Sequence, residues 1–330
     1  MYDRHVDDAG RPWWRRPAAW AAAALLLSGA LGGAWASGLF SPPACSGAPL
    51  RITVAAQPEI APALTDVASR FNVEKHRVSG RCVHTSVTPV APASFKGRAD
   101  AWVPESSLWL DVVQAAPSSA ASVVSTPVVL ATPRPVEDEF KDAGIDTSWT
   151  LLLKDNADGL ALERIVADPS AGMTGTIAML AIEQVDKDAD VAEALRKNGG
   201  STATLAGFIG DERFARPLAV TTEQAVVAYN ETHRPNPAVS LMPDEGTLML
   251  DYPYAVTAKD QHRRDAAEAF HAALGARSAR DILQRAGFRA PDGTMAAPYA
   301  HEHDLSGKAP KSLRLPTRGE IDEALSSWKA

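Results

Sequence analysis

Residues 161–176 read Ala161-Leu-Glu-Arg-Ile-Val-Ala-Asp-Pro-Ser-Ala-Gly-Met-Thr-Gly-Thr176. Residues 161–166, apolar except for Glu163 and Arg164, predict a short strand, and the following helix is predicted over 177–183. The turn between them, Ala167 to Thr176, is built of small and hydroxylated residues. Free N–H groups and the positive dipole of a helix N-terminus can bind an oxyanion or a polar ligand, and hydroxyls beside them add donors. Asp, Ser and Thr before a helix are also ordinary caps, so the turn alone indicates either a ligand site or a cap.

The same order of strand, loop and helix recurs along most of the chain. Further strands are predicted over 50–55, 82–90, 99–103 and 215–221, and further helices over 60–72, 107–115, 264–274 and 278–286. This alternation indicates an α/β fold with a parallel sheet covered on both faces. Two longer β-rich runs, Val123 to Thr132 and Leu248 to Thr257, are expected to cross between two lobes.

The expected architecture is therefore two-lobed with an interlobe cleft. Lobe 1 comprises residues 50–130 and 254–298, lobe 2 comprises 131–253, and a tail or connector helix occupies 299–330. Ligands of such sheets bind at the carboxyl ends of strands, where loops lead into helices. Four loops qualify: 56–59, 104–107, 168–176 and 221–224.

The N-terminus predicts export. Residues 1–16 carry four arginines, whereas residues 17–40 carry no charge and are long enough to cross a bilayer. We expect 1–16 to be cytoplasmic, 17–40 to be a transmembrane or signal segment and 41–49 to be a linker, which gives a single-pass membrane protein with an extracytoplasmic C-terminal portion. Cleavage near Ala36, at a small-x-small pattern, is the alternative and would release a secreted protein.

The composition of the chain narrows the possible classes of function further. The chain has 330 residues, is 45% hydrophobic and carries a net charge of −7, which argues against a nucleic-acid partner. Its two cysteines, Cys45 and Cys82, both fall on the exported side. A pair in an oxidising compartment predicts a disulfide rather than a redox or metal site.

A set of short motifs resembles the type II periplasmic solute-binding proteins, in particular an exported actinobacterial branch that is often followed by a von Willebrand factor A-type domain. The resemblance covers Leu50 to Pro298. The motifs that carry it are Ile52-Thr-Val-Ala-Ala-Gln-Pro-Glu-Ile60, Ala99-Asp-Ala-Trp-Val-Pro-Glu-Ser-Ser-Leu-Trp109, Pro127-Val-Val-Leu-Ala-Thr132, Asp168-Pro-Ser-Ala-Gly-Met-Thr-Gly175, Thr221-Thr-Glu-Gln224 and Ala286-Gly-Phe288.

The resemblance implies a non-enzymatic protein that closes on a small polar solute by hinge motion and serves a membrane transporter. The residues that it places at the ligand are Gln57, Glu59, Ser106, Ser107, Ser170, Thr174, Gly175 and Glu223. These loops lack Arg and Lys, which argues against a strongly anionic ligand such as a dicarboxylate, although neutral N–H and O–H donors alone can hold a tetrahedral oxyanion. Glu59, Glu105 and Glu223 instead favour a ligand with amine or hydroxyl donors. Residues 315–330 resemble the connector to the von Willebrand-type domain; alternatively, Trp328 docks on the lobes with a closing helix.

The sequence does not indicate catalytic, cofactor or metal chemistry. No Gly-x-Ser-x-Gly, His-Glu-x-x-His, P-loop or Gly-x-Gly-x-x-Gly motif is present, so we expect no catalytic residues, no cofactor and no metal. Trp102 and Trp109 could stack on a ring but are more typical of core residues. The hypothesis from a different class is an envelope protein-interaction module that keeps the fold without a solute, and a cleft filled by large side chains would favour it.

Overall fold

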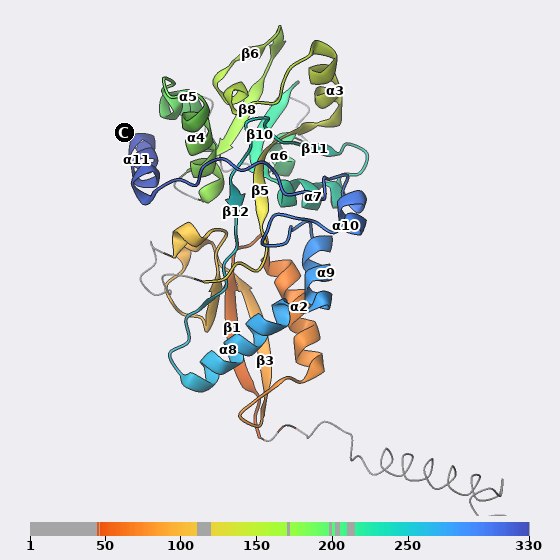
Figure 1. Ribbon diagram of the computed structural model, residues 1–330, viewed down its shortest axis with the longest axis vertical. Helices are drawn as coiled ribbons and strands as arrows, with labels where there is room; N and C mark the ends of the chain where they lie inside the picture. Colours follow the sequence, from red (N-terminus) through yellow and green to blue (C-terminus); the bar gives the residue numbers. More distant parts are fainter. Residues whose placement is uncertain are drawn as a thin grey trace, which may run out of the picture. The chain divides into compact units, whose positions relative to one another are not determined.

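Two β-sheets, one in each lobe, organise the protein (Figure 1). The computed structural model describes residue 45 and residues 47–110, 120–169, 172–197, 200–201, 205–209 and 215–329. The described residues from Gly47 onward belong to one compact unit. In Figure 1 the sheet that contains β1 and β3 lies at the bottom of this unit and the sheet that contains β5 and β10 lies at the top.

The first sheet has the strand order β13-β4-β1-β3-β2. Its strands are β1 (Leu50–Ala56), β2 (Arg77–Val78), β3 (Arg81–Pro89), β4 (Ala101–Val103) and β13 (Ala255–Val256), and its helical elements are α2 (Ala61–Glu74), η2 (Pro92–Ser94), η3 (Ser107–Trp109), α8 (Gln261–Leu274) and α9 (Arg277–Arg285). β1 pairs in parallel with both β3 and β4, as the alternation of strands and helices predicts. Helix α2 buries Leu64, Val67 and Phe71 at the expected helical spacing.

The second sheet has the order β11-β5-β10-β8-β9, and β12 also pairs with β5. Its strands are β5 (Thr126–Pro133), β8 (Glu163–Ala167), β9 (Gly200–Ser201), β10 (Pro217–Thr222), β11 (Ala238–Leu241) and β12 (Met249–Leu250), beside the small hairpin β6 (Asn156–Ala157) and β7 (Leu160–Ala161). Its helical elements are α3 (Arg134–Ala143), η4 (Trp149–Leu153), α4 (Met173–Val185), α5 (Val191–Lys197), α6 (Leu205–Ile209) and α7 (Glu223–Thr232). β8 and β10 are parallel, but β5 runs antiparallel to β10 and β11, so this sheet is mixed rather than all-parallel.

Before its C-terminal tail, the chain crosses between the sheets twice, and these two crossing segments lie side by side. The Val123 N–H donates to the Tyr252 carbonyl at 3.1 Å. β5 already belongs to the second sheet at Thr126, so the first crossing precedes it. The predicted returning run is broken into two short strands, because β12 pairs in the second sheet and β13 in the first. Tyr252 lies between them with a φ of 35°, a left-handed conformation that is uncommon for a bulky residue.

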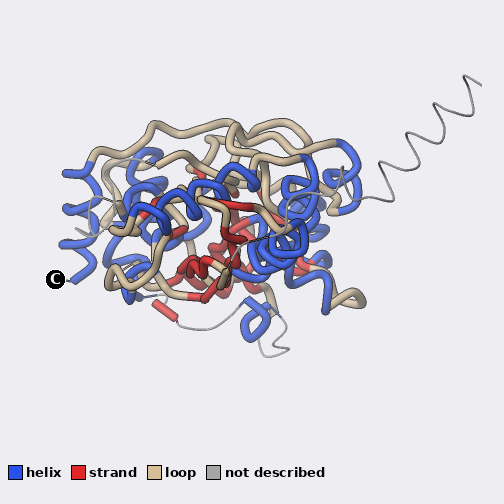
Figure 2. The backbone as a smooth tube through the Cα atoms, turned by 90° about the horizontal axis from the view of Figure 1, so that it is seen from below, coloured by secondary structure: helices blue, strands red, loops and turns tan. Residues whose placement is uncertain are grey.

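The C-terminal tail docks on the second lobe. It contains α10 (Ala297–Glu302) and α11 (Arg318–Lys329), and α11 packs against α4 and α5 (Figures 1 and 2). Ile321 and Ala324 of α11 are buried, and the Trp328 Nε1 donates to the Asp168 Oδ1 at 2.9 Å. This is the docked arrangement of Trp328, the alternative to a free connector.

Cys45 and Cys82 form the predicted disulfide. The predicted segments 1–16 and 17–40, and part of the predicted linker 41–49, lie outside the described residues. Within the described residues, no helix combines the length and the apolar character needed to span a membrane.

Candidate functional site

Two of the four predicted loops meet because β1 and β4 are neighbouring parallel strands whose carboxyl ends reach the same sheet edge. The Gln57 N–H donates to the Val103 carbonyl at 2.8 Å, which ties the loop after β1 to the end of β4. The Gln57 Nε2 then donates to the Glu105 Oε2 at 3.2 Å. The structure thus brings Gln57, a predicted ligand residue, against Glu105 of the second predicted loop.

Glu105 is the centre of this cluster and is only 2% exposed. Its Oε1 accepts a hydrogen bond from the Trp109 Nε1 at 3.1 Å and another from the Met173 N–H at 2.7 Å. Met173 is the first residue of α4, so this carboxyl joins the first lobe to the second. Burial, and then the nearby Glu59 carboxylate, raise the pKa of Glu105 to about 7.

Glu59 lies beside Glu105 and is held by Tyr252. The Tyr252 hydroxyl donates to the Glu59 Oε2 at 2.7 Å, and the Tyr252 N–H donates to the Glu105 carbonyl at 3.2 Å. The Glu59 side chain is half-buried, and desolvation of its carboxyl raises its pKa although the Tyr252 hydrogen bond lowers it. The left-handed backbone of Tyr252 therefore lies at the site, where such strain commonly occurs.

In the loop after β4, the Ser106 hydroxyl and the Ser107 N–H both serve the local structure. The Ser106 Oγ accepts from the Leu108 N–H at 3.3 Å and caps η3. The Ser107 N–H donates to the Asp251 Oδ1 at 2.7 Å, and the Ser122 Oγ donates to the other Asp251 oxygen at 3.2 Å. Asp251 thereby connects this loop to both crossing segments, a role that no local sequence pattern signals.

The third loop leads from β8 into α4. Ser170 lies outside the described residues, and Thr174 is half-buried in the first turn of α4. Gly175 is buried for a packing reason, because a Cβ there would overlap the Ala167 carbonyl oxygen. Thr176 is also buried, and its hydroxyl donates to the Pro169 carbonyl at 2.9 Å.

The fourth loop is occupied by an internal ion pair. Both Glu223 oxygens accept from the Arg289 guanidinium, at 2.6 and 2.9 Å, and both side chains are almost fully buried. Arg289 also donates to the Gly293 and Lys308 carbonyls at 3.0 and 2.9 Å. The carboxylate of Glu223, a predicted ligand residue, is thus held inside the protein. The pairing joins residues 66 positions apart, so no local motif could have signalled it.

The aromatic residues at the site divide between packing and hydrogen bonding. Trp102 is fully buried and stacks on Phe95 with ring centroids 4.5 Å apart, as expected for a core residue. Trp109 is also buried, but its indole N–H is aimed at Glu105. Among the described residues, no group of three or more His, Cys, Asp and Glu side chains could hold a metal ion.

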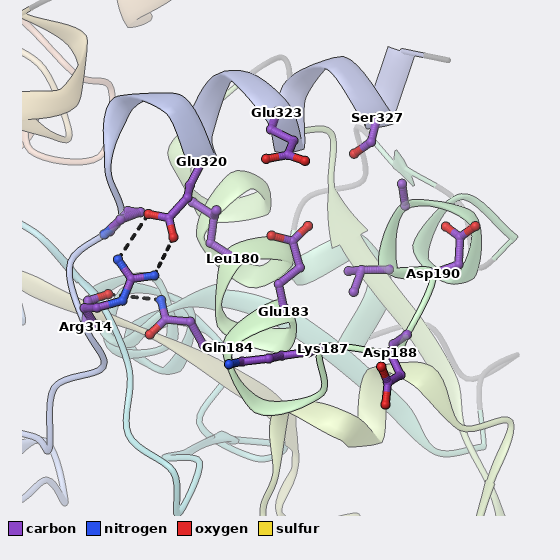
Figure 3. A pocket seen from close by; sticks show the side chains of 14 residues that line it. Leu180, Glu183, Gln184, Lys187, Asp188, Asp190, Arg314, Glu320, Glu323 and Ser327 are labelled. Atoms are coloured by element: carbon purple, nitrogen blue, oxygen red, sulfur yellow. Dashed lines mark hydrogen bonds and ion pairs between the residues drawn. The ribbon is translucent and has the colours of Figure 1, made fainter.

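A separate hollow of about 830 Å³ lies between α4, α5 and α11 (Figure 3). Glu183, Glu320 and Glu323 line it, and Arg314 pairs with Glu320 on one side. Desolvation, followed by the charges of Glu323 and Glu320, raises the pKa of Glu183. This acidic hollow follows from the docking of α11 and contains none of the predicted ligand residues.

Two lobes, two crossings and convergent strand-end loops define a periplasmic-type binding protein. Residues 52–289 match the family model described as bacterial extracellular solute-binding protein, and the chain belongs to this family. It is 27% identical over 299 residues to the uncharacterized protein Rv1836c of Mycobacterium tuberculosis, an alignment that covers 75% of this chain. The chain spans 43% of the length of that relative.

Solved structures with little sequence identity share the fold. A periplasmic thiamin binding protein superposes with a TM-score of 0.63 at 13% identity, covering 87% of this chain and 98% of that one. The ferric binding protein from Campylobacter jejuni gives 0.58 at 12% identity, covering 84% and 98%. The sulfate-binding protein SubI from Mycobacterium tuberculosis H37Rv gives 0.56 at 18% identity, covering 84% and 96%.

Proposed function

We propose that this protein binds a small polar solute between its lobes, at the cluster formed by Gln57, Glu59 and Glu105, outside the cytoplasm. Membership of the solute-binding family supports this proposal. The observation that carries it is the hydrogen bond from the Met173 N–H to Glu105, because it marks the point where strand-end loops of both lobes converge. Delivery to a membrane transporter, or a sensory role, is the corresponding cellular function.

The charges at the cluster support a solute with ammonium or hydroxyl donors. Glu59 and Glu105 lie close enough for the Glu59 charge to raise the pKa of Glu105. Among the described residues, no ion pair joins either carboxylate to a basic side chain. An ammonium group would supply the missing countercharge and a hydroxyl would donate hydrogen bonds to the carboxylates, whereas an anion would meet two carboxylates.

The N-terminal segment and the branch of the family to which the chain belongs are also part of what we propose. We propose that residues 17–40 anchor the chain in the membrane, with cleavage near Ala36 as the alternative. Membership of the branch that is often fused to a von Willebrand factor A-type domain is likewise a proposal, supported by the greater length of the mycobacterial relatives.

A second candidate function is the envelope protein-interaction module. It is favoured by the large side chains at the lobe boundary, since Glu105, Trp109 and Tyr252 are all buried there and contact one another or Glu59. Such a module would present an outer surface to a partner and bind no solute between the lobes.

Native mass spectrometry of the protein, purified from its host without denaturation, tests the proposal. We expect a co-purified small molecule that dialysis removes and re-addition restores, and a rise in melting temperature with that molecule. Glu59→Gln should weaken binding about 10-fold or more, whereas Glu302→Gln, at an exposed glutamate of α10, should not. Persistent absence of a bound mass, with no thermal shift across amines, amino acids and sugars, would favour the interaction module.

A further inference from the structure

Helix α4 begins without a capping side chain of its own. Its N-cap residue is Gly172, which has no side chain to accept a hydrogen bond from the first turn. The first N–H of the helix, that of Met173, instead donates to the Glu105 Oε1 at 2.7 Å. A carboxylate from the other lobe therefore occupies the position at which a helix N-terminus binds an anion.

The surroundings of the Glu105 carboxyl are built to hold it. The Trp109 Nε1 donates to the same oxygen as the Met173 N–H, and the Gln57 Nε2 donates to the other oxygen. A Cβ on Gly172 would lie 3.3 Å from the Glu105 Oε1, so the glycine gives the carboxyl room to approach α4. All three groups are donors, and a carboxylate accepts from all of them at once.

We infer that Glu105 is a specificity-determining residue, an internal anion that occupies the N-terminus of α4 and so excludes free oxyanions from the interlobe site. This inference rests on the solute site proposed above. A sulfate ion would compete for the Met173 N–H against the Glu105 carboxylate, which the protein itself already holds at this position. It would also add a negative charge beside Glu59 and Glu105, at a place where water is largely excluded.

The acidic groups around Glu105 also oppose the binding of a free oxyanion. Glu59 faces it from the loop after β1, and Tyr252 faces both carboxyls from the returning crossing. Asp251, next to Tyr252, is bound to the Ser107 N–H in the same loop as Glu105. Removing the Glu105 carboxyl should leave the first turn of α4 open to an external anion with one repulsive charge fewer.

Isothermal titration with sodium sulfate at pH 8 tests the inference on the full-length protein and on Glu105→Ala, with Glu302→Ala as the matched control at an exposed glutamate. We expect no measurable sulfate binding by the wild type or the control, and at least a 10-fold lower dissociation constant for Glu105→Ala. Glu105→Ser also removes the carboxyl and leaves the first turn of α4 vacant. This vacancy variant replaces Glu105→Ala in the titration if the alanine variant does not keep the wild-type circular dichroism spectrum.

Sulfate binding by the wild type as tight as that of Glu105→Ala would overturn the inference, as would a folded vacancy variant that binds no sulfate. Unfolding of both vacancy variants would also overturn it, because Glu105 would then be required by the fold and not a replaceable occupant. If a solute co-purifies but neither Glu105 variant gains sulfate binding, the proposed function stands and the inference fails. If a Glu105 variant gains sulfate binding but no solute is found for the wild type, the inference stands and the proposed function fails.

Discussion

At the scale of single residues, the environment of Glu105 is contradictory. Three donors favour its charged form, while burial and Glu59 favour the neutral form. The balance raises the pKa of Glu105 to about 7, so the carboxylate predominates only above this pH. The Gln57 Oε1 is buried and has no hydrogen-bond partner. A 180° turn of this amide would let the Gln57 Oε1 accept the proton of a neutral Glu105, so one side chain can serve both protonation states.

Stability should consequently fall as pH rises. The Glu105 carboxyl loses its proton near pH 4.5 in the unfolded chain but only near pH 7 in the folded protein, so folding retains a proton between these values. The stabilisation is complete below pH 4.5 and is lost as pH rises to about 7, an effect of about 3 kcal/mol. Urea unfolding at pH 5, 6, 7 and 8 measures it. Glu105→Gln should show a shallower decline, with the remainder due to Glu59, and an equal slope in both proteins would contradict this.

At the scale of secondary-structure elements, the strand–loop–helix units were predictable because each depends on local apolar spacing. The predicted helix over 60–72 is confirmed as α2 with bounds shifted by one or two residues. Helix α3 was missed because Pro133-Arg134-Pro135 was interpreted as the continuation of the crossing strand, although proline is favoured in the first turn of a helix. Of the helix predicted over 107–115, the structure describes only a short 3-10 turn, η3.

The site was predictable only in part, since its contacts depend on strand order. Gln57 and Glu105 meet because β1 and β4 are neighbours, and the chain between them offers no local indication of this. The pairing of Glu223 with Arg289 likewise depends on how the two lobes associate. The ligand roles of the predicted residues stay predictions.

Helix α11 gives a prediction at this scale. The Trp328 Nε1 bonds to Asp168 in the loop that precedes α4, so α11 should restrain that loop. Trp328→Phe keeps most of the apolar contact but removes the donor, and we expect a loss of about 1 kcal/mol together with faster amide exchange at the start of α4. Hydrogen exchange by mass spectrometry measures this. Lys329→Ala, at an exposed neighbour, is the control, and unchanged exchange in Trp328→Phe would show that the docked helix does not restrain the loop.

At the scale of the whole unit, buried polar contacts join the two lobes in more than one place. Arg289 follows α9 of the first lobe, whereas Glu223 is the first residue of α7 in the second. Nearby, the Gln224 Nε2 donates to the Ala286 carbonyl at 3.1 Å. A Cβ on Gly287 would lie 2.8 Å from the Val227 Cβ, so a glycine permits this close approach. Any hinge motion has to accommodate this fixed contact.

Breaking the Glu223–Arg289 pair should therefore weaken the association of the lobes. Glu223→Gln leaves the Arg289 charge buried without its counterion, and we expect a loss of about 3 kcal/mol in the free energy of unfolding. Calorimetry should also show the two lobes melting in separate transitions. The double variant Glu223→Leu with Arg289→Met removes both charges and should recover part of the loss. A loss below about 0.5 kcal/mol in Glu223→Gln would contradict the prediction.

The hydrogen bond between Trp109 and Glu105 has an optical consequence. An indole whose N–H is bound to an ionisable carboxyl changes its emission when that carboxyl gains or loses charge, or when a solute displaces it. We therefore expect Trp109 to act as an intrinsic fluorescent reporter at the boundary between the lobes. Because the chain has eight tryptophans, its signal is the difference between the emission of the wild type and that of Trp109→Phe.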